Sequence, residues 1–271
     1  MSEWDATSYE GKDTILRVVR AEAERFLALA EPPEAWQAPT ACRDWAVRDL
    51  VGHLVDTTEG YFAAFDAARS GGASGQPYGL PGMGERANAQ ATAFRDVPQD
   101  ELLARLRADL ERMLGMLGDL GPDEWTDLIV PHYYMGPLPA YFFAAGQLMD
   151  YAVHSWDIRQ GTGRAHGLPG DAADLLVPFM FVLWQSTVRA DADLTPFQVG
   201  IRVTGRNAGD FRISVSDKGM SYEKGGVEDL PTVIDFDAGS LVLTTFGRSN
   251  SGTVRGDLAV ADRYLNLFFS I

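Results

Sequence analysis

The sequence has very little lysine and only one cysteine. Its 271 residues include 38 Asp and Glu against 23 Lys and Arg, which gives a formal net charge of −15, and its only lysines are Lys12, Lys218 and Lys224. A protein that neutralises phosphates needs a positive face, and the sequence holds no cluster of Lys and Arg that would supply one. Nucleic acid and anionic membranes are therefore not expected as partners, and the excess of negative charge mainly favours solubility.

The single cysteine, Cys42, excludes an intrachain disulfide. The first residues lack a basic patch followed by an apolar run, which is the pattern of a secretory signal. No apolar stretch approaches the roughly 20 residues that span a bilayer. These absences indicate a cytoplasmic protein, and we expect it to be a monomer that acts on small molecules.

Helices dominate the first two-thirds of the chain, because apolar residues recur there at helical spacing. Pro32 and Pro33 end the first helix, Asp44 is predicted as the N-cap of the second, and the glycine-rich segment 70–84 is predicted as a loop. The expected helices cover about residues 6–30, 44–68, 100–117, 139–160 and 172–189.

Beyond Pro196 the pattern changes to short segments with alternating or β-branched residues, separated by Gly and Asp. They predict a small antiparallel sheet made of residues 197–203, 211–216, 220–223 and 232–236. Two further helices, 240–246 and 258–269, would pack on one face of it and complete an α+β unit. The predicted fold is a helical bundle over residues 1–190 followed by a small α+β domain over residues 191–271.

Three residues of the bundle are candidates for a metal site. Asp150 and His154 are four apart on one predicted helix, so they share a face, and their surroundings are apolar, where such groups are costly unless paired or metal-bound. From this pair alone, a plain Asp–His hydrogen bond is the simpler explanation. His53, on the helix expected over 44–68, completes a set of two imidazoles and one carboxylate that suits a catalytic divalent ion with open coordination positions.

Two blocks of sequence around these residues resemble a known family. Residues 39–54, PTACRDWAVRDLVGHL, resemble a signature of the DinB-like metalloenzymes and, more narrowly, of the mycothiol-dependent maleylpyruvate isomerase family. Downstream, GPLP at 136–139 precedes a helix with the pattern Asp150-x-x-x-His154-x-x-Asp157, in matching order and separation. The C-terminal unit is similar to the sterol-carrier-like domain that these proteins append, so the resemblance covers nearly the whole chain.

The resemblance implies a fold and a metal site. The fold would be a DinB-like four-helix bundle followed by a sterol-carrier-like domain. A divalent ion, with zinc as the first choice, would bind His53, Asp150 and His154. The family usually has Glu where this chain has Asp150, and the shorter side chain would retune or weaken the site without abolishing ligation, since Asp is an ordinary oxygen ligand.

The resemblance also draws attention to residues around the ion, which would bind the substrate or orient a metal ligand. An arginine of the C-terminal domain would hold an anionic substrate or thiol, and Arg248 is the best match, with Arg255 as the fallback. Asp157 would orient His154 as a hydrogen-bond partner; alternatively it caps the helix or forms a surface ion pair. Cys42 precedes a helix, where a thiol pKa can fall, but a small buried hydrophobic role is the preferred interpretation because no histidine is near it in the sequence.

Three functions follow from these assignments. The first is a thiol-dependent transferase or isomerase, in which a low-molecular-weight thiol, mycothiol by resemblance, is activated at the metal and attacks a small electrophile. The second is a metal-dependent amide hydrolase, with Asp157 as general base. The third is a non-catalytic small-molecule binder, if Asp150 marks a decayed site.

Overall fold

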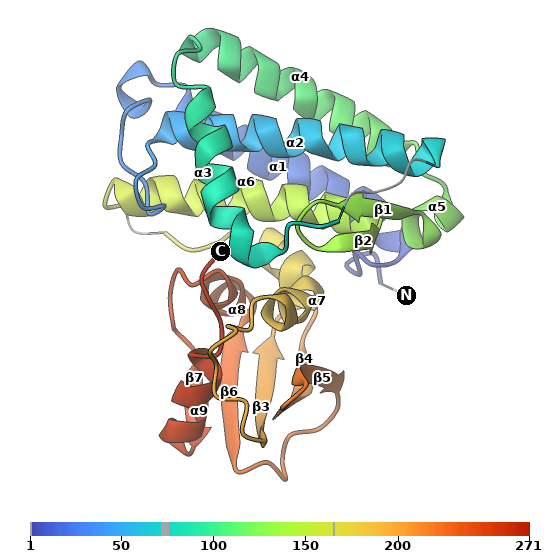
Figure 1. Cartoon of the computed structure of the whole chain (residues 1–271), viewed down its shortest axis with the longest axis vertical. Coiled ribbons are helices and arrows are strands. Elements are labelled where there is room, and N and C mark those ends of the chain that lie inside the picture. Colours follow the sequence, from blue (N-terminus) through green and yellow to red (C-terminus); the bar gives the residue numbers. More distant parts are fainter. Residues whose placement is uncertain (1, 72–75, 165) are drawn as a thin grey trace. The chain divides into compact units, whose positions relative to one another are not determined.

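The chain forms two compact units, Met1–Ala172 and Ala173–Ile271. The structure, a computed structural model, describes residues 2–71, 76–164 and 166–271 (Figure 1). The division falls earlier than the predicted boundary at residue 190, because most of helix α7 (Gly170–Ser186) belongs to the second unit. Phe181 of this helix packs on Phe211 and Tyr222 of the sheet, at ring-centroid distances of 4.1 and 5.1 Å.

The first unit is a four-helix bundle, as predicted. Helix α1 packs against α6 and α4, and α2 packs against the same two helices (Figure 1). Helix α6 is buried from Phe142 to Ile158 except at Asp150, which is half-buried, and such burial is typical of a helix surrounded by others. Polar side chains on α6 therefore point into the bundle. The four helices are α1 (Lys12–Ala30), α2 (Val47–Ser70), α4 (Gln99–Gly118) and α6 (Tyr141–Gly161).

Smaller elements between these helices were not predicted. Helix α3 (Met83–Ala93) runs across α2 and buries only Ala91, so its apolar pattern is weak (Figure 1). It begins inside the segment predicted as a loop, of which residues 72–75 lie outside the described residues. The other additions are short: η1 (Tyr9–Gly11), η2 (Pro33–Ala35), η3 (Leu80–Gly82), α5 (Pro122–Asp127), and a hairpin of β1 (Ile129–His132) and β2 (Gly136–Pro139).

The start of α2 differs from the prediction. Asp44 is not the N-cap; it adopts a left-handed conformation with φ of 69°, which Asp tolerates better than most residues. The helix begins at Val47, and Asp49 Oδ2 accepts a hydrogen bond from the Ala46 N–H at 2.9 Å. Burial acts to raise the pKa of Asp49, but hydrogen bonds from Arg95, at 2.8 and 3.0 Å, and from Ala46 hold it below its ordinary value.

The buried Lys12 ties α1 to the end of α4. Its Nζ donates hydrogen bonds to the carbonyls of Gly118 and Leu120, at 2.7 and 2.8 Å. Carbonyls at a helix C-terminus lack partners within the helix, and a cation there also interacts favourably with the helix dipole. The lysine charge is thereby satisfied inside the fold.

The second unit contains a five-stranded sheet in the order β5-β4-β3-β6-β7. The prediction of an antiparallel sheet is wrong at one pairing, because β3 and β6 are parallel. The unpredicted β7 pairs with β6. Helices α8 and α9 both contact β3 and β6. The elements are β3 (Phe197–Thr204), β4 (Gly209–Ser216), β5 (Gly219–Lys224), β6 (Thr232–Asp237), α8 (Ala238–Thr245), β7 (Thr253–Gly256) and α9 (Leu258–Leu265).

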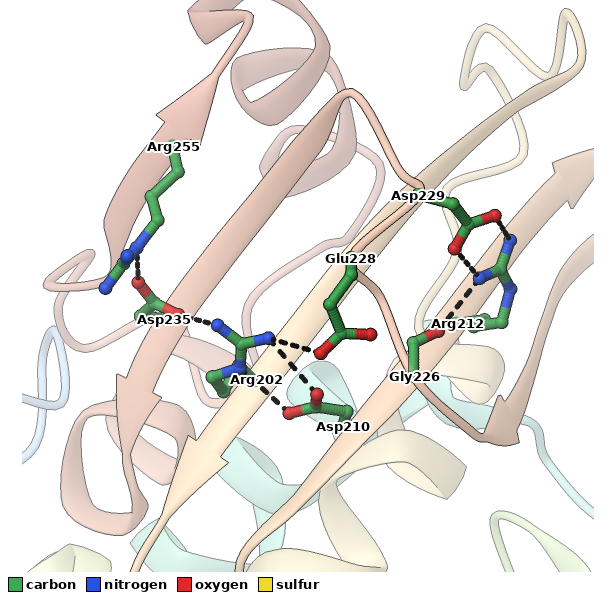
Figure 2. Close-up of polar contacts among 8 residues, drawn as sticks. All are labelled: Arg202, Asp210, Arg212, Gly226, Glu228, Asp229, Asp235 and Arg255. Carbon is green, nitrogen blue, oxygen red and sulfur yellow. Dashed lines mark hydrogen bonds and ion pairs between the residues drawn. The ribbon is translucent and has the colours of Figure 1, made fainter.

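Ion pairs fasten the loop between β5 and β6 to the sheet (Figure 2). Arg202 of β3 reaches Asp210 at 3.0 Å and Glu228 of the loop at 3.3 Å. Arg212 of β4 binds Asp229 of the same loop at 2.5 Å. Val227, the residue before Glu228, is fully buried and lies where a side chain at position 200 would otherwise project, since a Cβ added to Gly200 would come within 2.8 Å of it.

The structure predicts a pH-dependent effect at Asp109 of α4. Burial raises the pKa of Asp109 to about 6, Glu59 adds to the shift, and Oδ2 is buried without a hydrogen-bond partner among the described residues. A carboxyl group whose pKa is raised by folding stabilises the fold at low pH, and this contribution is lost as the pH rises through 6. We expect Asp109→Asn to raise the free energy of unfolding by about 1–2 kcal/mol at pH 8.

Urea unfolding at pH 4 and pH 8 measures this effect, and at pH 4 the variant and the wild type should be equally stable because the carboxyl group is already protonated. Asp66→Asn, which removes an exposed carboxylate from α2, is the matched control and should show no such difference. An equal gain for Asp109→Asn at both pH values would contradict the assignment.

Candidate metal centre

The bundle brings His53, Asp150 and His154 together. One potential ligand atom from each residue lies within 4.8 Å of the others. His53 Nε2 is 3.8 Å from Asp150 Oδ1, and the two imidazole rings meet edge to face with centroids 5.1 Å apart. A separation of 3.8 Å is too long for a hydrogen bond. It is close to the roughly 3.4 Å expected between two ligands that bind one zinc ion tetrahedrally at about 2.0–2.2 Å.

Asp157 fixes the orientation of His154. Its Oδ2 lies 2.9 Å from His154 Nδ1, and Asp157 is fully buried, so it is not a surface group. Because a carboxylate only accepts hydrogen bonds, Nδ1 carries the proton and the Nε2 lone pair is left for an ion. Burial lowers the pKa of His154 although Asp157 acts in the opposite direction. The ring is therefore held in the neutral form that binds metals.

Asp150 provides the strongest indication that an ion belongs here. Its Oδ2 is buried and has no hydrogen-bond partner in the described part of the chain. A buried carboxylate oxygen without a donor or cation is costly. A divalent cation next to His53 and His154 would satisfy it, so the three residues fit the ion that the resemblance implies. The shorter side chain of Asp, in place of the usual Glu, does not prevent this approach.

The structure also places Cys42 beside this group, which the sequence did not indicate. Its Sγ lies 3.1 Å from Asp157 Oδ2 and 3.8 Å from His154 Nδ1. The sequence favoured Cys42 as a small buried hydrophobic residue because no histidine lies near it along the chain. The fold brings it next to His154, which is 112 residues away in sequence. The Ala41 N–H donates to the Asp157 carbonyl at 2.9 Å, which fixes the segment that carries the thiol.

Cys42, His154 and Asp157 form a second group whose potential ligand atoms lie within 4.8 Å. Their side chains already contact one another, because Asp157 Oδ2 lies within hydrogen-bonding distance of both the thiol and His154 Nδ1. The group of His53, Asp150 and His154 instead leaves a carboxylate oxygen unsatisfied. The group of His53, Asp150 and His154 therefore accommodates an ion better. Cys42 and Asp157 then lie on the Nδ1 side of His154 and do not bind the ion.

Aromatic residues surround the ligand group. The Trp45 ring centroid is 5.2 Å from that of His53 and 6.3 Å from that of His154. His132, in the β1–β2 hairpin, packs on Tyr61 at 5.8 Å. Burial lowers the pKa of His132 to about 4, and its Nδ1 accepts hydrogen bonds from two backbone N–H groups, at 3.2 and 3.3 Å. His132 is therefore neutral at pH 7, with its proton on Nε2.

The two arginines predicted to hold an anion both lie in the second unit. Arg248 Nη1 donates hydrogen bonds to the carbonyls of Phe246 and Ile271, at 2.9 and 2.6 Å. Arg255 pairs with Asp235 (Figure 2). Each guanidinium thus has partners within its own unit, and a role for either toward a substrate stays a prediction.

The profile of the mycothiol maleylpyruvate isomerase N-terminal domain matches residues 16–159. The chain belongs to this family. The match includes all three candidate ligands and confirms the family indicated by the two sequence blocks. None of the curated proteins compared matches the chain significantly. No helix in the described ranges is long and apolar enough to cross a membrane.

Solved structures show the same fold in this isomerase family. A mycothiol-dependent maleylpyruvate isomerase is 13% identical with a TM-score of 0.59, and the match covers 91% of this chain and 94% of that one. A histidine-to-alanine variant of a mycothiol-dependent maleylpyruvate isomerase is 12% identical, with the same TM-score and coverage. The colibactin self-resistance protein ClbS, solved with double-stranded DNA, is 16% identical with a TM-score of 0.49, over 57% of this chain and 97% of that one.

Proposed function

We infer that this chain is a metal-dependent enzyme that uses a low-molecular-weight thiol, of the mycothiol type, for thiol transfer, thiol exchange or isomerisation of a small electrophilic substrate. The observation that most supports it is the convergence of His53, Asp150 and His154 around an unsatisfied carboxylate oxygen. The family supports the thiol, because its name specifies mycothiol. Such thiols are kept reduced in the cytoplasm, where we expect the enzyme to act.

In this proposal, His53, Asp150 and His154 hold a divalent ion, with zinc as the first choice. A divalent ion lowers the pKa of a thiol or a water molecule that coordinates it, which supplies a nucleophile at neutral pH. Asp157 keeps the proton of His154 on Nδ1 and thereby orients the ring. Cys42 lies against the same carboxylate oxygen and helps to fix its position.

The contacts of Asp157 favour thiol chemistry over amide hydrolysis. A hydrolase of this type needs a general base that reaches the attacking water. Asp157 was the sequence candidate for that base, but it is fully buried and its Oδ2 faces His154 Nδ1 and the thiol of Cys42. An orienting role suits these contacts better. The solved isomerases lead us to propose addition and elimination of a thiol at a double bond as the reaction, with Arg248 as a candidate to position an anionic group.

Elemental analysis followed by thermal unfolding with small thiols tests this function. We expect one divalent ion per chain and a rise in Tm with mycothiol that glutathione does not match. At 100 times its Kd, a ligand adds about 2.7 kcal/mol of apparent stability. The first control is S-methylated mycothiol, which should give a much smaller rise in Tm. The second is mycothiol added to protein from which the metal has been removed with a chelator, and it should also give a much smaller rise. The absence of a stoichiometric ion, or turnover of small amides without thiol, would contradict the proposal.

A further inference from the structure

The hydroxyl group of Tyr61 lies on the face of α6 that carries the metal group. Tyr61 belongs to α2 and is 5% exposed, and its hydroxyl has no hydrogen-bond partner in residues 2–71, 76–164 and 166–271. The hydroxyl oxygen lies over Gly146 of α6, where an added Cβ would come within 2.6 Å of it. Gly146, Asp150 and His154 follow one another at intervals of four residues and therefore share one face of the helix. The hydroxyl thus lies along the row that includes two of the three ligands.

His132, at the end of β1, provides a second donor close to Tyr61. Its ring centroid is 5.8 Å from that of Tyr61 and 5.8 Å from that of Phe143 on α6. Because Nδ1 accepts hydrogen bonds from the N–H groups of Tyr134 and Met135, the proton of the neutral ring is on Nε2. This outer N–H has no acceptor in the part of the chain that the structure describes. The backbone of the hairpin therefore fixes the tautomer and leaves one donor unused.

The charge of Asp150 acts on both groups. Burial is the main cause that raises the pKa of Tyr61, and Asp150 adds to the rise. Burial lowers the pKa of His132 to about 4, and Asp150 acts against this change. Both groups are therefore near the metal group, and both are neutral donors at pH 7. Largely buried donors without an acceptor are costly to the fold, and a ligand oxygen that accepts from them would remove that cost.

We propose that Tyr61 and His132 donate hydrogen bonds to a carbonyl oxygen of the substrate and stabilise the negative charge that this oxygen gains when a thiolate adds to a conjugated double bond. This inference rests on the proposed function and adds two catalytic residues to it. Donors that are held in position in a largely buried site stabilise such a charge without reorganisation. They bind the charged oxygen more strongly than the uncharged carbonyl group, and this preference accelerates a reaction.

The reaction balances without any further reactant. The thiolate sulfur forms a bond to the carbon at the far end of the double bond, and the π electron pair moves to the carbonyl oxygen, which accepts from Tyr61 and His132. The former double bond is then single, so the molecule rotates about it. The electron pair returns, the carbon–sulfur bond breaks and the thiolate leaves, while both donors keep their protons throughout.

The absorption spectrum of 4-dimethylaminocinnamaldehyde tests the two donors on the zinc-loaded full chain. This conjugated aldehyde absorbs at longer wavelength when its carbonyl oxygen accepts hydrogen bonds, because its excited state carries more negative charge on that oxygen. The wild type should bind it saturably with such a shift. Tyr61→Phe and His132→Asn should each reduce the shift and weaken binding roughly 2–10-fold, which is the effect of losing one neutral hydrogen bond. Asn is chosen because its side-chain oxygen can still accept from the hairpin N–H groups.

Addition of mycothiol to the same aldehyde gives a second measurement. Each variant should lose roughly 100-fold in kcat, with a much smaller change in KM, because the donors act mainly on the charge that develops during the reaction. The matched control is Tyr264→Phe, which removes from α9 of the second unit a buried hydroxyl that has no hydrogen-bond partner among the described residues. This variant should equal the wild type in spectral shift, binding and kcat.

Zinc content and urea unfolding of each variant are measured alongside. The proposal is overturned if the wild type shows no spectral shift, or if either Tyr61→Phe or His132→Asn keeps the full shift while retaining zinc. A shift that depends on Tyr61 in a chain that neither holds stoichiometric zinc nor adds mycothiol would support the two donors and contradict the proposed function, so the two failures are distinguishable.

Discussion

Replacing His53 with alanine should leave a folded protein without a stoichiometric divalent ion and without thiol-dependent activity. The substitution removes one of only two imidazole ligands and leaves Asp150 and His154 on a single helix. Loss of a residue that merely orients a ligand already weakens metal binding 10–100-fold, so loss of a ligand should weaken it by more than roughly 100-fold. Competition with a chelator of known zinc affinity measures the change.

Three other variants calibrate this result. His166→Ala removes a histidine that belongs to neither ligand group and should keep the ion. Asp157→Asn leaves all three ligands and should weaken zinc binding roughly 10–100-fold. Asp150→Glu introduces the residue that the family usually has, and we expect it to retain zinc. If the His53→Ala protein still bound one zinc ion per chain, the ion would have to be held by other residues.

Replacing Gly161 with alanine should strongly destabilise the bundle and weaken metal binding. A Cβ at this last residue of α6 would lie 2.2 Å from the Pro39 carbonyl oxygen and 2.4 Å from Thr40 Cα. These are backbone atoms that cannot rotate away, so the segment that carries Cys42 must move. Overpacking of this kind costs about 1–3 kcal/mol, and the shift should also disturb the contact between Cys42 and Asp157.

Gly115→Ala is the matched control. Gly115 is exposed within α4, and an added Cβ would meet nothing within 4 Å. Alanine should therefore stabilise the helix by about 0.5–1 kcal/mol. Urea unfolding of the two variants and of the wild type, followed by zinc titration, gives both effects. Equal unfolding midpoints for Gly161→Ala and Gly115→Ala would mean that α6 does not approach the 39–42 segment as closely as described.

The sequence alone predicted the four bundle helices and the group of His53, Asp150 and His154. The helices follow from local periodicity, which each segment displays by itself. The spacing of four residues places Asp150 and His154 on one face whatever the rest of the fold does. Adding His53 to them depended on the chemistry of the ligand set and on the family resemblance, because no local rule joins two helices that lie about a hundred residues apart.

The features that were not predicted depend on contacts between distant segments or on elements too short to show a pattern. Cys42 meets Asp157 across 115 residues. The parallel pairing of β3 with β6 cannot be distinguished from an antiparallel one by alternation of residues. The strands of the β1–β2 hairpin are four residues long, and α3 has one buried residue.

The strand order of the second unit leaves β5 and β7 as the edges of the sheet, where another chain could add a strand. Strand β7 is four residues long. Two of the three lysines flank β5, with Lys218 just before it and Lys224 as its last residue. If two copies paired antiparallel with Ser221 of one opposite Ser221 of the other, Lys218 of each would face Lys224 of the other, and like charges directly opposite oppose such pairing. The scarce lysines thus protect the sheet against growth into a larger assembly.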